Sequence, residues 1–136
     1  MVSLAIKKRG RFLSDIVEPL DRGKYYLELP EELQHYLSRL AKSEYPTLRF
    51  LSQLSPYDDE HIDDGRVVDL IEESARFLIE VRNRACPEPP GKVEWLGEEN
   101  AGSPFGWHGL ETWLESLGQF CQLALHIGDE TWSVGD

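Results

Sequence analysis

The residues best suited to chemistry lie in one short acidic segment near the middle of the chain. This segment reads Asp58-Asp59-Glu60-His61-Ile62-Asp63-Asp64-Gly65, so five of its eight residues are acidic. An EF-hand calcium loop needs oxygen ligands at positions 1, 3 and 5, glycine at position 6 and glutamate at position 12. With Gly65 at position 6, isoleucines fall at positions 3 and 12. Because Ile62 and Ile71 have no side-chain oxygen, the sequence excludes an EF-hand here.

Three interpretations of the acidic segment stay open. Asp59, His61 and Asp63 are candidates for a looser transition-metal site completed by ligands from elsewhere. Alternatively, the carboxylates are solvated and cap the helix that follows. The third interpretation is a contact surface for a basic partner, with an aromatic anchor of the kind enriched in interfaces. On this third interpretation, the partner-binding residues are Tyr57, Asp58, Asp59, Glu60, His61, Asp63 and Asp64.

The rest of the chain carries no catalytic or cofactor motif. The four histidines form no HxxxH or HExxH pair, and no glycine-rich phosphate loop or nucleophile elbow occurs. Cys121 falls on an apolar helical stripe, and Cys86 has no histidine near it in sequence. We therefore predict a protein that is not an enzyme and that uses no cofactor or metal. A small metal-dependent hydrolase built on His61 is the alternative.

Charge points to the class of partner. The 136 residues include 14 Lys and Arg and 25 Asp and Glu, a net charge of −11, and no Lys or Arg follows Lys92. Such a surface repels phosphate backbones and anionic lipids, which predicts neither a nucleic-acid nor a membrane partner. It favours a basic protein, although acidity that serves solubility alone would look the same. The sequence leaves the oligomeric state open.

The N-terminal residues and the two cysteines indicate the cellular compartment. The first residues have a short apolar stretch followed by Lys7, Lys8 and Arg9, which is not the order of a secretory signal. No apolar run is long enough for a transmembrane helix. Two cysteines 35 residues apart make no disulfide framework. We expect a reduced cytoplasmic protein.

Apolar periodicity predicts the elements that position the acidic segment. Val2, Leu4 and Ile6 alternate with other residues, as in a strand that pairs with a terminal strand over 131–134. Residues 24–29 are either a second strand or an extended lead-in. Helices are predicted over 12–18, from Pro30, from Pro46, over 65–85 and over 110–127, the last one ending at Gly128.

The helix over 65–85 has the clearest pattern. Its predicted buried stripe comprises Val67, Leu70, Ile71, Ser74, Leu78, Val81 and Ala85, with Phe77 beside it. Asp63 or Asp64 is expected to cap its first turn. On the other face, Glu72, Arg76, Glu80 and Arg84 follow one another at four-residue spacing. This spacing predicts a ladder of exposed ion pairs.

Residues 86–108 interrupt the helical pattern with prolines and glycines, yet they contain large aromatic side chains. Long connections of this kind are either functional or disordered. Because aromatic residues are rare in disordered linkers, we expect the segment to lie over the core, with a short strand near Val93–Leu96. Trp95, Phe105, Trp107 and Trp132 are therefore either core residues or the lining of an apolar binding patch.

Short motifs give the second half of the chain a resemblance. They are Tyr45-Pro46-x-Leu48, Tyr57-Asp58-Asp59, Leu70 with Glu73, Phe120-Cys121 and Trp132-x-Val134-Gly135-Asp136. Their order over residues 45–136 is similar to that in small, acidic, uncharacterised bacterial cytoplasmic proteins. Some proteins of that kind are immunity proteins, which neutralise a toxin made by the same cell. The resemblance thus implies a class of function and no catalytic residues.

These observations lead to one prediction of fold and function. We predict a single domain over residues 1–136 of the mainly α (α+β) class, with about four helices and a small sheet formed by terminal strands. We predict a non-enzymatic protein-binding module, of immunity type if the resemblance holds. A ligand-binding or assembly protein that uses the aromatic residues of segment 86–108 is the alternative.

Overall fold

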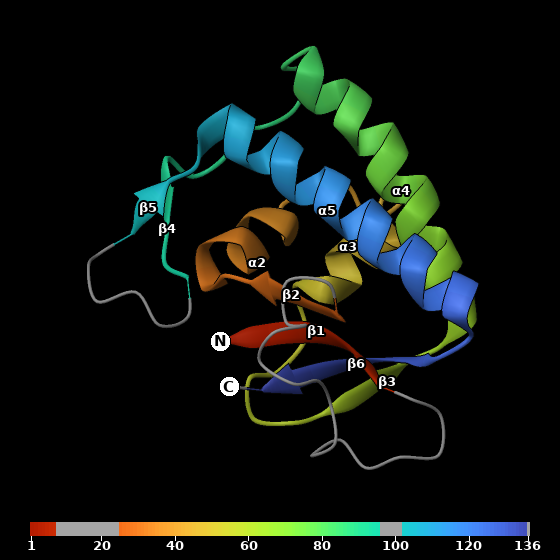
Figure 1. Ribbon diagram of the computed structural model, residues 1–136. Helices are drawn as coiled ribbons and strands as arrows, with labels where there is room; N and C mark the ends of the chain where they lie inside the picture. Colours follow the sequence, from red (N-terminus) through yellow and green to blue (C-terminus); the bar gives the residue numbers. More distant parts are fainter. Residues whose placement is uncertain (8–24, 96–101, 136) are drawn as a thin grey trace.

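The computed structural model describes residues 1–7, 25–95 and 102–135. Within this part, four helices lie above an antiparallel sheet, which confirms the predicted mainly helical α+β fold (Figure 1). The helices are α2 (Glu31–Leu37), α3 (Pro46–Leu51), α4 (Asp64–Arg82) and α5 (Gly106–Ile127). The predicted helix over 12–18 lies outside the described residues.

The sheet joins the two ends of the chain. It contains β1 (Val2–Lys7), β2 (Tyr26–Leu29), β3 (Glu60–Ile62) and β6 (Glu130–Gly135) in the order β2-β1-β6-β3. The predicted pairing of the terminal strands is confirmed, with Val2 opposite Gly135 and Lys7 opposite Glu130. The strand interpretation of residues 24–29 is also confirmed, because β2 pairs with β1.

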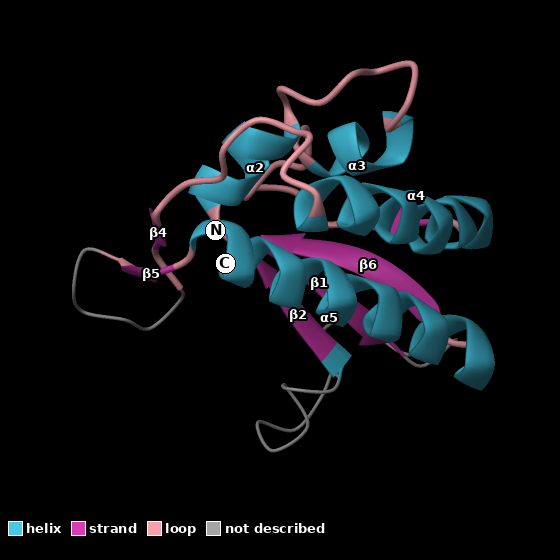
Figure 2. Ribbon diagram, turned by 90° about the horizontal axis from the view of Figure 1, so that it is seen from above, coloured by secondary structure: helices cyan, strands magenta, loops and turns pink. Residues whose placement is uncertain are grey.

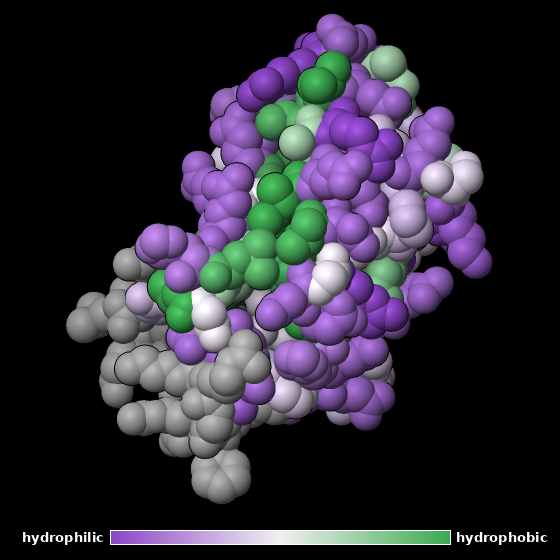
Figure 3. Space-filling view, turned by 90° about the vertical axis from the view of Figure 1, so that its right-hand side faces the viewer, coloured by the Kyte–Doolittle hydropathy of each residue, from purple (hydrophilic) through white to green (hydrophobic). Residues whose placement is uncertain are grey.

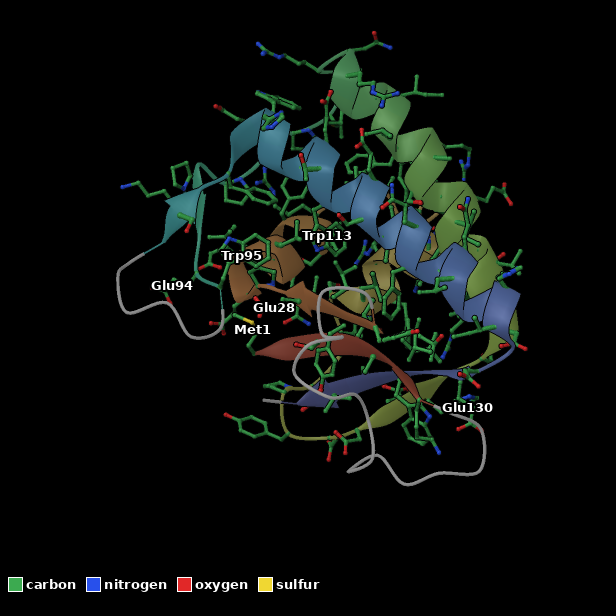
Figure 4. All side chains as sticks on the ribbon, viewed as in Figure 1. Met1, Glu28, Glu94, Trp95, Trp113 and Glu130 are labelled. Atoms are coloured by element: carbon green, nitrogen blue, oxygen red, sulfur yellow. The ribbon has the colours of Figure 1, made fainter. Side chains whose placement is uncertain are left out.

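A single cluster of buried side chains lies between the sheet and the helices. Val2, Leu4 and Ile6 of β1 contribute to it from below. From above, α5 crosses the sheet (Figure 2) and contributes the longest buried stripe, which includes Leu110, Leu117 and Cys121. Trp113 also points from α5 toward β2 (Figure 4), where its indole Nε1 donates a hydrogen bond of 3.0 Å to the backbone oxygen of Glu28.

A buried carboxylate links two of the helices. Glu73 of α4 is 4% exposed and accepts hydrogen bonds from the backbone N–H groups of Thr47 (2.9 and 3.2 Å) and Leu48 (3.1 Å). These groups are in the first turn of α3, whose own N-cap residue, Tyr45, offers no side-chain hydrogen bond. Glu73 therefore supplies from a neighbouring helix the acceptor that a local cap normally provides.

The predicted ion-pair ladder on α4 is wrong except for its first step. The Arg76 Nε and Glu72 Oε1 atoms are 3.9 Å apart, and Arg76 also donates to the backbone oxygen of Glu44. The helix ends at Arg82, so Arg84 is outside it, has a positive φ of 52° and stacks its guanidinium over Trp107. Residues four apart are neighbours only where both lie in the helix, and α4 ends before Arg84, although the sequence pattern extends to residue 85.

Candidate functional site: the acidic segment beside the sheet

The acidic segment (residues 58–65), with Tyr57 directly before it, runs along one edge of the sheet. Its middle forms β3, with His61 opposite Trp132 and Ile62 opposite Thr131 of β6. The sequence predicted a loop without this strand, because a three-residue strand in a charged stretch has no periodicity of its own. The pairing spreads the seven predicted partner-binding residues along the sheet edge, from the Gly135 end of β6 toward its Glu130 end.

Tyr57 is the most exposed large hydrophobic residue among those described. Its side chain is 91% exposed and precedes the exposed residues Asp58 and Asp59. The turn that carries it packs closely on the end of β6, because a Cβ atom at Gly135 would overlap the backbone carbonyl of Pro56. The packing of this turn on β6 therefore keeps the Tyr57 side chain directed toward solvent.

Two of the predicted contact residues hold the segment in place. Asp59 Oδ1 accepts a hydrogen bond of 3.3 Å from the backbone N–H of Gly135. Asp63 Oδ1 accepts one of 2.9 Å from the backbone N–H of Arg66 and is the N-cap of α4, which decides between the two predicted caps.

The three remaining carboxylates of the segment are exposed. Those of Asp58, Glu60 and Asp64 form no hydrogen bond or ion pair with other residues in the described ranges. Their negative charge is therefore available to an external group.

His61 belongs to a small cluster on the sheet face. Its ring centroid lies 5.3 Å from that of Trp132, and the Lys7 ammonium is 5.6 Å from the same indole. Glu130 completes the cluster: its Oε2 atom is 3.0 Å from Lys7 Nζ and accepts a hydrogen bond of 3.2 Å from Trp132 Nε1. The hydrogen bond from Lys7, assisted by the one from Trp132, lowers the pKa of the Glu130 carboxyl.

Sequence reasoning did not identify this cluster, although the signal was available. The predicted pairing of the terminal strands, continued by one residue at each end, places Lys7 opposite Glu130.

The described residues contain no group of three or more His, Cys, Asp and Glu side chains placed to hold a metal ion. The looser site considered for Asp59, His61 and Asp63 is not assembled, because each of these side chains contacts a different partner.

The two cysteine thiols do not have the lowered pKa of a reactive thiolate. Burial raises the pKa of Cys121 to about 12 and also raises that of the half-buried Cys86.

No family model, curated protein or solved structure matches this chain. The case for a function therefore depends on the geometry of its own residues. No helix in the described ranges is both long and apolar enough to cross a membrane.

The four aromatic residues considered as a binding patch do not form one group. Trp95 and Trp107 pack against the core, and Trp95 lies 6.4 Å from the buried ring of Phe105. They flank the hairpin of β4 (Lys92–Val93) and β5 (Ser103–Pro104). Of the strand predicted near Val93–Leu96, only Val93 is in β4; Glu94 and Trp95 are not in a strand, and Leu96 lies outside the described residues. Trp132 lies instead on the sheet beside His61. The core interpretation holds for the first three residues.

A shallow hollow of about 470 Å³ lies beside α2. Glu31, Glu32, His35 and Arg39 line it, together with Tyr36, Glu88 and Pro90. The Tyr36 hydroxyl donates a hydrogen bond of 2.7 Å to the backbone oxygen of Pro87. The charges that line the hollow are mixed, and Glu31 also lines a second hollow that reaches Tyr57. Glu31 thus borders both hollows.

Proposed function

We propose that this protein is a non-enzymatic binding module that recognises a basic protein through the acidic segment. The observation that carries this proposal is Tyr57, an aromatic ring 91% exposed at the head of a row of carboxylates. Exposed tyrosines are favoured at protein interfaces because a large, rigid ring is desolvated there at little entropic cost. Asp58 and Glu60 supply charge next to this anchor.

Electrostatics supports the basic character of the partner. The net charge of −11 attracts cationic proteins over several ångströms, and such steering raises the association rate. The same field acts against nucleic acid and anionic membrane as partners. We propose further that the chain is an immunity-type inhibitor of a basic toxin in the reducing cytoplasm. This narrower proposal is supported by the motif resemblance and by the two free cysteines.

The test starts with capture of the partner. The immobilised chain is exposed to native lysate, and the captured protein is purified and its association rate measured at several salt concentrations. We expect a partner with excess Lys and Arg. The double variant Asp58→Asn with Glu60→Gln should associate about tenfold more slowly at low salt and show a weaker salt dependence. Tyr57→Ala should chiefly accelerate dissociation.

The matched control is Glu88→Gln with Glu94→Gln, which removes the same charge from exposed positions outside the acidic segment. If both double variants slow association equally, the segment is not the contact surface. If the captured protein is acidic, the proposed class of partner is wrong. Suppression of the captured protein's toxicity by co-expression tests the inhibitor role.

A further inference from the structure

One edge of the sheet has a backbone without a partner among the described residues. β3 is the last strand in the order β2-β1-β6-β3, so only the side that faces β6 is paired (Figure 1). No other backbone hydrogen bond joins Glu60–Ile62 to a residue in the described ranges. At the opposite edge, the backbone oxygen of Glu28 in β2 already accepts the hydrogen bond from Trp113. The edge of β3 is therefore the side on which the sheet can be extended.

The groups that point away from β6 are the backbone N–H and C=O of His61. Successive residues of a strand direct these groups to opposite edges, so either His61 or both of its neighbours face outward. Ile62 is 0% exposed, as expected if its groups face β6, whereas His61 is exposed. The N–H of Gly135 reaches Asp59 and so points from β6 toward the β3 side. By alternation, the backbone of Thr131 points the same way, toward Ile62.

The side chains of β3 determine which segment could pair with this edge. Glu60 and Asp58 are exposed, and neither carboxylate forms an ion pair with a described residue. On the other face of the strand, His61 lies against the half-buried indole of Trp132. A strand added here would therefore meet a carboxylate on one face and aromatic rings on the other.

We propose that the basic partner of the acidic segment contributes an extended segment that pairs with β3 and continues the sheet. Its Lys or Arg residues lie opposite Glu60, and apolar or aromatic residues alternate with them opposite His61. This inference rests on the proposed function and specifies how that partner binds. Two copies of the chain, each with a net charge of −11, repel one another, which favours a basic segment over a second copy. On the side of the molecule that Figure 3 shows, hydrophilic side chains likewise predominate around one apolar band, which suits a polar partner segment.

The experiment uses the full chain and a fluorescent peptide of about nine residues in which Lys and Val alternate. Fluorescence anisotropy measures its dissociation constant. His61→Pro removes the outward N–H without removing a hydrogen bond to β6, and it should weaken binding about tenfold. His61→Ala is the matched control, because it removes the same side chain and keeps the N–H, so it should retain most of the binding. Circular dichroism and urea unfolding verify that both variants are folded.

Two further peptides test the pairing even if His61→Pro does not fold. One carries N-methyl groups on the amides of its Lys residues, and the other carries them on the amides of its Val residues. Because a strand directs successive N–H groups to opposite edges, pairing with β3 requires that only one of the two peptides loses binding. Equal effects of the two methylations overturn the proposal, and so does a parent peptide that does not bind.

The variant Asp58→Asn with Glu60→Gln separates this inference from the proposed function. If it weakens peptide binding while the two methylated peptides bind alike, the acidic segment recognises basic partners without strand pairing, and only the inference fails. If it changes binding of neither the peptide nor the captured partner, the proposed function fails as well. A dimer in sedimentation that His61→Pro dissociates would identify a second copy as the occupant and overturn the proposal.

Discussion

At the scale of single residues, the buried carboxylate of Glu73 should contribute strongly to the stability of the fold. It accepts three hydrogen bonds from two backbone N–H groups of α3, and a buried donor without an acceptor costs about 1–3 kcal/mol. Glu73→Ala should therefore lower the free energy of unfolding in urea by about 2–4 kcal/mol. Glu73→Gln keeps one acceptor oxygen and should lose less.

The neighbouring Glu72 provides the control for Glu73. Its side chain is 70% exposed, and its only ion pair with a described residue is 3.9 Å long, so Glu72→Ala should change stability by less than about 0.5 kcal/mol. Equal effects at the two positions would show that the α3 amides do not depend on Glu73.

A second residue-scale prediction concerns pH. The Lys7 ammonium lowers the pKa of Glu130, so folding favours the ionised carboxylate. The resulting stability is present above the ordinary carboxyl pKa and is lost as the pH falls through the lowered value. Lys7→Met should raise the pKa of Glu130, measured by NMR titration of its side-chain carboxyl, and flatten the stability profile in that acidic window. Lys92→Met, at an exposed position of β4, should leave this pKa unchanged.

At the scale of elements, the acidic segment stabilises a helix in addition to its proposed role in binding. Asp63 caps α4, the helix that carries Glu73. Asp63→Ala should lower the free energy of unfolding by about 1 kcal/mol, whereas Asp63→Asn, which still accepts the hydrogen bond from Arg66, should change it little. Urea denaturation measures both.

Asp58→Ala is the matched control for the cap, because Asp58 is equally acidic and exposed but lies outside α4. If Asp58→Ala destabilised the protein as much as Asp63→Ala, general charge effects and not capping would explain the loss. This distinction also guides the binding experiment, in which Asp63 is best left unchanged.

At the scale of the whole molecule, the charge of −11 makes the folded state repel itself. Salt screens this repulsion, so the Tm should rise by a few degrees between about 10 mM and 300 mM NaCl. Glu88→Lys with Glu94→Lys changes the net charge by four, from −11 to −7, and should reduce the salt effect. A Tm that falls with added salt would contradict this account. Calorimetry at fixed pH measures both proteins.

Local patterns in the sequence determine much of the fold. Alternation in Val2–Lys7, the proline before α2, the proline that starts α3 and Gly128 after α5 specify elements that the structure contains. These features work because they act over a few residues, through backbone conformation and burial period. The exposed carboxylates of the acidic segment are equally a local property.

Only the tertiary structure decides the features that depend on distant partners. β3 exists because Glu60–Ile62 lie beside β6, and the buried face of α4 includes Glu73 because its carboxylate has distant partners in the backbone of α3. The Lys7–Glu130–Trp132 cluster joins residues from the two ends of the chain. Hydrogen bonds and packing between segments far apart in sequence produce no periodic pattern in either segment. The sequence therefore indicates the charge of the surface, while the fold determines the shape of that surface.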